Sequence, residues 1–394
     1  MQNFKREIKE ELDQILRYWM KFTFDETNGG FVGRIDNENK VYNEAPKGSV
    51  LNARILWTFS AAYNATSNSE YLKIADKAYA YITEFFIDTE YGGVFWSVDY
   101  KGTPFDTKKQ VYAIAFVLYA FCECYKSTGN KVVKTNAIRL YHLIQQYSYD
   151  EIKGGYFEAF SRNWQPMEDL RLSDKDANEK KTMNTHLHIL EAYTNLYRIW
   201  PSQKLAKHQR ELVNDFLHYI ISPETGHLDL FFDEDWKVKG NTISYGHDIE
   251  ASWLLLEAAE ALKDDDLIIR CKVAAVTLAN AAAEGLDTDG GLWYEYEPSE
   301  HLLLKQKHWW PQAEAMVGFI NAWQVSKDEK YLQHAFHSWQ FIKQFILDKK
   351  NGEWFWGVNG DYSIMNGEDK VGIWKCPYHN SRACLEIIRR LSVE

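Results

Sequence analysis

The chain repeats one short signal six times: an acidic turn that contains glycine, followed in most copies by a run rich in aromatic residues. The first glycines of successive turns lie 62 to 72 residues apart along the whole sequence. These glycines are Gly29, Gly92, Gly154, Gly226, Gly290 and Gly352. A regular period of this length indicates one supersecondary unit used six times, stacked so that neighbouring units bury a continuous core.

The period also decides how the chain divides into domains. A length of 394 residues would suggest two or three domains at the usual size of about 150 residues. However, the repeat runs from end to end and no low-complexity linker interrupts it. With 45% hydrophobic and 15% aromatic residues the chain can fill a large core. We therefore predict a single catalytic domain over residues 1–394.

Each interval between two turns has room for two helices of different character. Residues 49–66 are apolar nearly all round, whereas residues 69–86 carry a single apolar stripe. This contrast predicts a buried helix followed by a half-exposed one. The same alternation recurs in four more pairs: 111–126 with 134–147, 182–199 with 203–221, 247–262 with 266–283, and 312–325 with 330–346.

The two ends of the chain supply one further helix each. Residues 380–391 follow the sixth turn without a partner, and residues 5–22 precede the first turn. Pairing them gives six inner and six outer helices. The sequence thus predicts an all-α fold, an (α/α)6 barrel with short β-hairpins at one end. An open α-solenoid is the alternative. The closed ring is favoured because the single helix at each end of the chain can serve as the partner of the other.

Composition excludes several classes of partner. The formal charge is −11 and the sequence has no dense Lys/Arg run, so we expect no nucleic-acid and no membrane partner. No run of about 18 apolar residues is present, and residues 1–20 form a charged amphipathic pattern, which predicts a cytoplasmic protein. Five cysteines without a CxxC pair predict free thiols. A neutral small molecule is the expected ligand.

In a closed ring, corresponding ends of the inner helices converge on one mouth, and here those ends carry polar and aromatic residues. A single buried histidine is usually a satisfied core residue. Several histidines, two glutamates and an arginine at the same end of different repeats indicate a functional site instead. Some of them lie three or four residues apart, so they project from the same face of one helix. The residues are Arg54, Tyr112, Asn184, His188, His247, Glu250, Trp253, Trp310, Glu314, His379 and Arg382.

The sequence does not predict a metal or a cofactor. His186 lies two residues from His188 and would face away from it on a helix, so the two do not form a metal-binding pair. Glycine-rich phosphate loops of the usual spacings are absent from the sequence. The longest polar interruption, residues 162–181, either covers the mouth or is a solvated connection.

The residue types at the mouth suit proton transfer. Imidazoles that face one cavity can act as base and acid near neutral pH. An open-chain sugar has an acidic hydrogen at C2, and its removal gives an enediolate that Arg54 could stabilise. Return of the proton to the opposite face of C2 inverts that centre, and return to C1 gives a ketose.

Four segments resemble the N-acylglucosamine 2-epimerase superfamily: 181–193, 244–251 (SYGHDIEA), 309–315 (WWPQAEA) and 374–380 (WKCPYHN). The resemblance spans essentially the whole chain. It implies an (α/α)6 barrel enzyme that epimerises the reducing-end glucose of β-1,4-linked disaccharides without a cofactor. Cellobiose would become glucosyl-mannose, and lactose would become epilactose.

The resemblance also implies a role for each matching residue. His247 and His379 would be the acid–base pair, with His188 assisting nearby. Residues matching known sugar-binding positions are Arg54, Glu250, Trp310 and Glu314, with Tyr112, Asn184 and Trp253 lining the pocket and Trp374 stacking on the second sugar. Our hypothesis is that His247 and His379 approach C2 from opposite faces of the enediolate, with rotation about C2–C3 between the two transfers.

Alternatives remain within and outside this superfamily. An aldose–ketose isomerase or an N-acylglucosamine or mannose epimerase would use the same intermediate. Glu250 and Glu314 could instead be the carboxylate pair of an (α/α)6 glycoside hydrolase, although a hydrolase gives no role to histidines on three inner helices. A sugar-binding barrel without catalysis is the non-enzyme alternative. We expect a monomer or a weak homodimer.

Overall fold

The computed structural model describes residues 1–392 and contains two layers of helices in this range. The inner helices are α2 (Ser49–Thr66), α4 (Val111–Thr128), α6 (Met183–Ile199), α8 (Tyr245–Leu262), α10 (Trp309–Ser326) and α12 (Tyr378–Arg390). The outer helices are α1 (Gln2–Phe22), α3 (Ser69–Tyr81), α5 (Lys131–Tyr147), α7 (Gln203–Asp215), α9 (Asp265–Ala283) and α11 (Glu329–Phe341).

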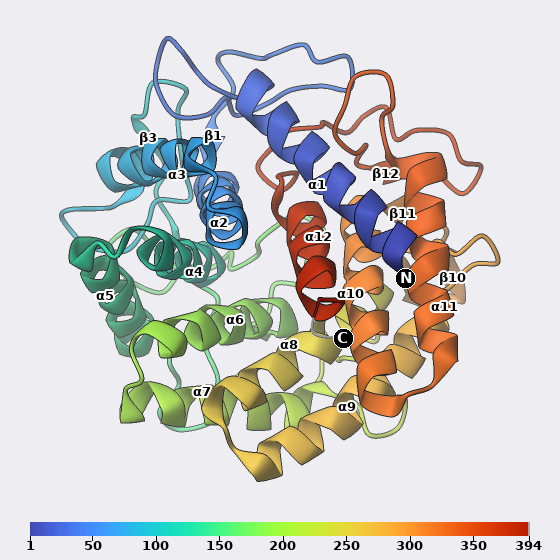
Figure 1. Ribbon diagram of the computed structural model, residues 1–394. Coiled ribbons are helices and arrows are strands. Elements are labelled where there is room, and N and C mark those ends of the chain that lie inside the picture. The colour runs from blue at the N-terminus through green and yellow to red at the C-terminus, as the bar shows by residue number, and fades with distance from the viewer. Residues whose placement is uncertain (393–394) are drawn as a thin grey trace.

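The inner helices form a closed ring with the outer helices around it (Figure 1). Each inner helix packs against the next, and α12 contacts α2 to complete the circle. The first helix, α1, packs against the last, α12, and Lys5 Nζ donates to Ser392 Oγ at 2.7 Å. The closed (α/α)6 barrel is therefore confirmed, and the open solenoid is excluded.

Burial follows the sequence pattern. Residues 49–62 of α2 are all buried, whereas α3 buries one stripe that includes Tyr71, Ile74 and Ala78. The outer helices α3, α7 and α11 each continue into a π-helical turn, namely η1 (Ile82–Phe86), η2 (Phe216–Ile220) and η4 (Ile342–Ile346). The apolar stripe predicted these turns as helix, because the buried face continues through them. The same stripe does not distinguish a π-helical turn from an α-helical one. Within residues 1–392, no helix is both long enough and apolar enough to span a bilayer.

The six repeated glycines all adopt left-handed backbone conformations, with φ between 75° and 86°. The amide of each donates to the carbonyl of the residue that opens its turn, at 2.9 to 3.0 Å. Glycine adopts this conformation without steric cost, which explains why the turn repeats with this residue. One antiparallel bridge closes each turn, as between Phe24 and Phe31.

Short antiparallel ladders join successive repeats. The strand before an inner helix pairs with a strand that follows the next turn; in the first ladder Lys47 lies opposite Val98. The strands are β1 (Lys47–Gly48), β2 (Ser97–Val98), β3 (Pro104–Asp106), β4 (Lys109–Gln110), β5 (Ala159–Phe160), β6 (Lys181–Thr182), β7 (Phe231–Phe232), β8 (Ile243–Ser244), β9 (Glu295–Glu297), β10 (Leu302–Leu304), β11 (Lys307–His308) and β12 (Gly357–Val358). A short 3-10 turn, η3 (Pro298–Glu300), separates β9 from β10. These ladders hold the N-terminal ends of the inner helices at one end of the ring.

A buried lysine–aspartate pair fixes five of the six turns. In each, a lysine that precedes an inner helix donates to the aspartate that opens a turn, at 2.5 to 2.8 Å, and the lysine side chain is at most 3% exposed. The pairs are Lys47–Asp25, Lys109–Asp88, Lys181–Asp150, Lys307–Asp287 and Lys370–Asp348. At the fourth turn His227 Nδ1 lies 2.6 Å from Asp248 Oδ2 instead.

We predict that Asp348→Asn destabilises the fold by about 3–5 kcal/mol, because Lys370 would be left as a buried charge without its carboxylate. Burial alone would raise the pKa of Asp348, but hydrogen bonds from Lys370 and the backbone bring it below its ordinary value, so the carboxylate is ionised at neutral pH. Urea denaturation followed by tryptophan fluorescence measures the loss. Glu70→Gln, which breaks an exposed pair with Lys73, should change stability by less than about 1 kcal/mol. Equal losses of stability in the two variants would contradict a stabilising role of the buried Lys370–Asp348 pair.

Candidate active site

A cavity of about 470 Å³ opens at the end of the ring where the inner helices begin. Its volume lies within the usual range of small-molecule sites. The residues of its wall that the sequence predicted are Arg54, Tyr112, Asn184, His188, His247, Glu250, Trp310, Trp374 and His379. The other three predicted residues, Trp253, Glu314 and Arg382, lie behind the wall: Trp253 Nε1 donates to Glu314 Oε2 at 3.1 Å, and Glu314 bonds to His379 and Arg382.

The loop between β5 and β6 covers part of this cavity. Residues 170–177 and 179 line it. Gln110 Nε2 holds the loop by donating to the carbonyls of Leu170 and Arg171, at 3.3 and 2.8 Å. Of the two roles open from the sequence, the structure thus supports a cover over the mouth.

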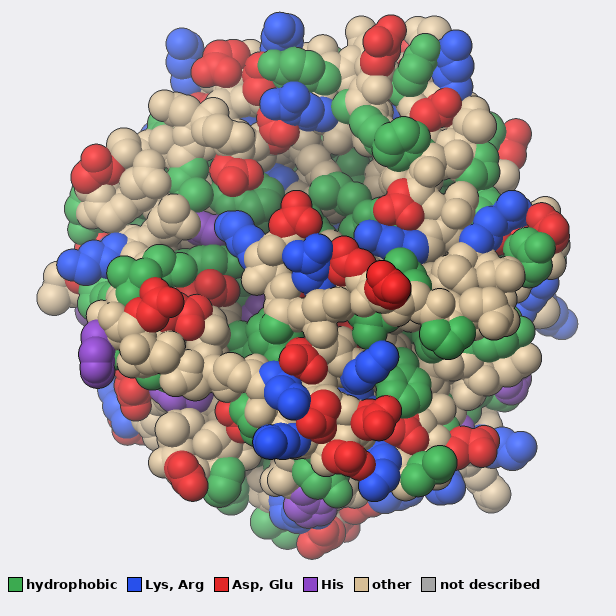
Figure 2. Space-filling model, turned by 180° about the vertical axis from the view of Figure 1, so that it is seen from behind, with side chains coloured by type: hydrophobic (Ala, Val, Ile, Leu, Met, Phe, Trp, Pro, Cys, Tyr) green, Lys and Arg blue, Asp and Glu red, His purple; other side chains and the backbone are tan. Residues whose placement is uncertain are grey.

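The molecule carries both signs of charge on the face opposite to that of Figure 1. Figure 2 shows acidic and basic side chains interspersed there, with hydrophobic side chains visible in the hollows between them. An extended basic surface, which nucleic acid would require, is not seen on this face.

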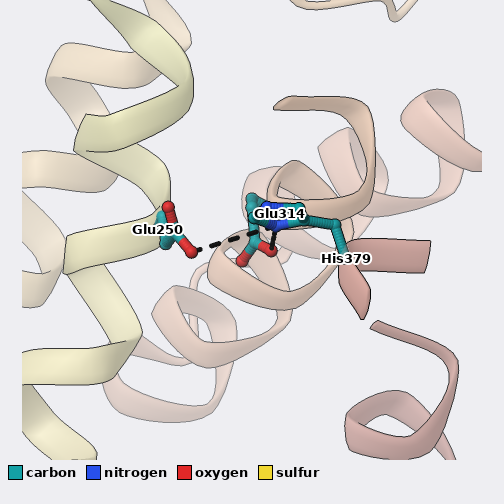
Figure 3. A group of neighbouring side chains, drawn as sticks. All are labelled: Glu250, Glu314 and His379. Atoms are coloured by element: carbon teal, nitrogen blue, oxygen red, sulfur yellow. Dashed lines mark hydrogen bonds and ion pairs between the residues drawn. The ribbon is translucent and has the colours of Figure 1, made fainter. Parts of the chain in front are cut away.

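His379 belongs to a buried cluster with Glu250 and Glu314, which come from three different inner helices (Figure 3). His379 Nδ1 lies 2.7 Å from Glu314 Oε1 and 3.9 Å from Glu250 Oε1. One nitrogen of Arg382, Nη2, donates to both Oε1 atoms at 2.6 Å. The arginine of α12 thus binds the carboxylates of α8 and α10 together.

His188 is held by a third carboxylate. Its Nδ1 lies 3.0 Å from Glu191 Oε2, one helical turn along α6. Glu191 Oε1 accepts hydrogen bonds from the Tyr378 hydroxyl and from Arg382 Nη1. The guanidinium therefore links α12 to α6 as well as to α8 and α10, and the indole of Trp253 packs 4.9 Å from it.

His247 has a neutral partner, because its Nδ1 lies 2.8 Å from the hydroxyl oxygen of Ser244. These three histidines, His188, His247 and His379, thus engage Nδ1 within the protein. The nitrogen left for a ligand is Nε2 in each case. The ring of Trp310 packs against two of them, with centroids 4.7 Å from His247 and 5.7 Å from His379.

Burial sets the protonation of these histidines. It lowers the pKa of His188, and it lowers the pKa of His247 to about 3. The pKa of His379 lies well below its ordinary value because of burial and the nearby charges of Arg54 and Arg382. All three imidazoles are therefore neutral at neutral pH, a form in which one of the two ring nitrogens can accept a proton.

The three carboxyl groups differ in their charge state. Burial opposes ionisation of Glu191, but Arg382 and the other donors lower its pKa to about 2. Burial raises the pKa of Glu250, and the charge of Glu314 raises it further. Burial also raises the pKa of Glu314, although Arg382 acts in the opposite direction. The cluster thus contains one firmly ionised carboxylate and two that resist ionisation.

Arg54 supplies hydrogen-bond donors to the opposite side of the cavity. Its Nη2 donates to the Tyr112 hydroxyl at 2.8 Å, and its guanidinium lies over the rings of Phe116 and Tyr378, at 4.2 and 5.0 Å. Among the described residues, Nε of Arg54 has no hydrogen-bond partner. Arg54 lines the cavity, so its guanidinium places a positive charge beside a ligand there.

The cluster of Glu250, Glu314 and His379 has donor atoms close enough together to bind a cation, within 4.8 Å of one another. However, Arg382 Nη2 already lies against the oxygens of both carboxylates. These residues fit a guanidinium better than a metal ion, which would have to displace it. That the protein requires no metal stays a prediction.

Other histidines have separate roles. His186 accepts the Tyr156 amide at Nε2 and bonds to the Thr182 carbonyl through Nδ1, so it faces away from His188 as expected. His308 stacks on Tyr294 at 3.9 Å and lines the cavity.

Sequence reasoning missed three residues of the site: Glu191, Tyr378 and Ser244. Each had a local signal, because it lies three or four residues along the chain from a partner: Glu191 from His188, Ser244 from His247, and Tyr378 from Arg382.

Comparisons with known proteins agree on one family. The model of the N-acylglucosamine 2-epimerase (GlcNAc 2-epimerase) family matches residues 29–383. The chain is 48% identical to a cellobiose 2-epimerase of Bacteroides fragilis and 40% identical to one of Dictyoglomus turgidum, over 98% of both chains in each case. A solved cellobiose 2-epimerase of Bacillus thermoamylovorans superposes with a TM-score of 0.95 at 39% identity, covering 99% of this chain and 100% of that one.

We predict that Arg382→Met lowers the free energy of unfolding by about 3–5 kcal/mol, because three buried carboxyl groups would lose their shared cation. Guanidinium denaturation followed by circular dichroism measures the change. The matched control on the same helix is Arg389→Met, which removes an exposed partner of Glu386 and should cost less than about 1 kcal/mol. If Arg382→Met were as stable as the control, Arg382 would not hold the cluster together.

Proposed function

We propose that this chain, which belongs to the N-acylglucosamine 2-epimerase family, inverts C2 of its substrate by proton transfer between C2 and two histidines, His247 and His379. Within the family it belongs to the isomerases that epimerise C2 of disaccharides such as cellobiose. In this proposal residues 1–394 work as one catalytic domain that needs no cofactor. Cellobiose would give glucosyl-mannose, and lactose would give epilactose.

One observation carries the proposal: three neutral imidazoles from three inner helices face one cavity with Nε2 unused. His247 and His379 both pack against the same indole, that of Trp310. An open-chain sugar lying against this indole would bring its C2 within reach of both imidazoles. Transfer to one imidazole and from the other inverts C2.

The reaction would proceed through the open-chain sugar. One histidine takes the C2 hydrogen as a proton, and the electron pair moves into the C1 carbonyl to give an enediolate. The charged donors of Arg54 stabilise its oxygens, in a buried site where such bonds are strong. The second histidine then delivers a proton to the opposite face of C2. His188 lies next to Tyr112, with ring centroids 5.0 Å apart, and assists at the sugar hydroxyls.

The second sugar would bind toward Trp374. This indole packs against Trp96 and Tyr112, with centroids 5.6 and 5.9 Å away, and lines the same cavity. Aromatic rings of this kind stack on the apolar faces of sugars. Asn184, on the wall near Tyr112 and His188, would position hydroxyl groups.

The geometry argues against a glycoside hydrolase. Such enzymes place two carboxyl groups on opposite sides of the scissile bond, about 5 to 9.5 Å apart. Here Glu250 and Glu314 both bond to Arg382 Nη2, and Glu314 lies behind the cavity wall. The pair cannot flank a glycosidic bond in this arrangement.

Incubation with cellobiose tests the proposal. We expect a disaccharide of unchanged mass whose reducing-end sugar is mannose, identified by chromatography after acid hydrolysis. His247→Ala and His379→Ala should each lower turnover by at least about a hundredfold while the chain stays folded, because general acid–base catalysis contributes this much or more. His334→Ala, on outer helix α11, should keep wild-type turnover.

Three results would contradict the proposal in different ways. Release of free glucose would indicate hydrolysis. A ketose as the main product would indicate an aldose–ketose isomerase. Binding of cellobiose without conversion would indicate a sugar-binding barrel.

A further inference from the structure

The buried arginine of the site faces more carboxyl groups than it can neutralise. Nη1 of Arg382 serves Glu191, which also accepts bonds from Tyr378 and His188. Nη2 alone serves both Glu250 and Glu314. Two carboxyl groups thus share one NH2 group of a single guanidinium, and their acceptor atoms lie within 4.8 Å of each other.

The wider surroundings do not correct this imbalance. The titratable and charged groups that face the pair come from five inner helices: Arg54 on α2, Tyr112 on α4, His188 and Glu191 on α6, His247 on α8, and Tyr378, His379 and Arg382 on α12. With the imidazoles neutral, two arginines oppose three carboxyl groups. If all three were ionised, the buried site would carry an excess negative charge, which a low-dielectric environment disfavours strongly.

We propose that Glu250 and Glu314 hold one proton between them in the resting enzyme, and that this proton reaches the substrate through His379. The inference rests on the proposed function for its second half, while the shared proton itself depends only on the buried cluster. Two carboxyl groups close together commonly share one proton in this way.

The geometry provides the route. His379 Nδ1 lies 2.7 Å from Glu314 Oε1, so a protonated Glu314 can donate to Nδ1 while Nε2 carries the imidazole hydrogen into the cavity. When Nε2 gives its proton to C2 of the enediolate, Nδ1 takes the proton of Glu314. His379 stays neutral, the substrate regains a C–H bond, and the carboxyl pair becomes fully ionised. The resting enzyme is restored when His247 loses its proton to water and the carboxyl pair regains one from water.

In the part of the chain that the structure describes, the other histidine, His247, has no protonated carboxyl group bonded to its Nδ1. His247 Nδ1 bonds to the hydroxyl of Ser244, which has no ionisable proton to offer near neutral pH. His247 therefore starts as the base and becomes an imidazolium when it takes the C2 proton. The two histidines thus differ in their partners: a hydroxyl behind the base and a protonated carboxyl pair behind the acid.

A second buried carboxyl group provides the control. Glu158 lies in the cavity wall and accepts the Thr182 amide at 2.8 Å and the Thr185 hydroxyl at 2.5 Å. Burial raises its pKa to about 8, so it is also protonated at neutral pH, but it bonds to no histidine. Its carboxylic acid should be seen independently of the pair.

Infrared spectroscopy of the whole protein at neutral pH tests the proposal, through the carbonyl stretch of protonated carboxylic acids. Glu250→Gln and Glu314→Gln should each remove one carboxylic acid per chain, because the remaining carboxyl group then ionises against Arg382. The double variant should lose no more than either single one. Glu158→Gln should remove one further carboxylic acid in any background.

Loss of two carboxylic acids in the double variant, or of none in both single variants, would overturn the proposal. If a glutamine variant fails to fold, the Glu158→Gln protein is measured with and without the alditol of cellobiose, which fills the cavity but cannot react. We expect the carbonyl band of a protonated glutamic acid to shift when the alditol binds. An unchanged spectrum at saturating alditol would overturn the proposal of a shared proton.

The two proposals fail separately. An intact band pattern in a protein that does not epimerise disaccharides would refute the function alone. Epimerisation without the band pattern would refute the shared proton alone.

Discussion

The site depends on one buried cation. Arg382 contacts carboxyl groups from α6, α8 and α10, and these in turn hold the Nδ1 atoms of His188 and His379. Arg382 lies on α12, the inner helix whose partner is α1 at the other end of the chain. The contacts of Arg382 with α6, α8 and α10 therefore depend on the closed ring, because α12 takes its place in the ring by packing against α1, α2 and α10.

The repeat is regular where it holds the ring and irregular where it faces the cavity. The six glycine turns and the buried lysine–aspartate pairs recur with similar geometry around the circle. At the cavity the repeats differ in the side chains they contribute: an arginine from α2, a tyrosine from α4, a tryptophan from α10 and histidines from α6, α8 and α12. A symmetric frame can carry an asymmetric site because the ladders between repeats fix the helix ends independently of the side chains that project from them.

Much of this could be predicted from the sequence because it depends on local patterns. The glycine turns located the helix ends, and the polar residues found there do meet in the structure. Glu191 and Tyr378 each have a local partner, but their mutual contact joins residues 187 positions apart, which no local spacing reveals. For residues 162–181 the sequence left two roles open, because the contact between Gln110 and the loop carbonyls has no sequence signature. The lysine–aspartate pairs were missed for a different reason: each lysine lies 20 to 31 residues from its aspartate, beyond the reach of helix or strand spacing.

In the proposed mechanism a histidine in this cavity takes the hydrogen from C2, and another histidine returns a proton that exchanges with solvent. Incubating the enzyme with cellobiose in heavy water and recording the proton NMR spectrum of the isolated epimer tests it directly. The account predicts deuterium at C2 of the mannose unit, seen as loss of its C2 proton signal. An epimer formed at full rate with its original hydrogen at C2, even when enzyme and substrate were equilibrated in heavy water beforehand, would contradict it.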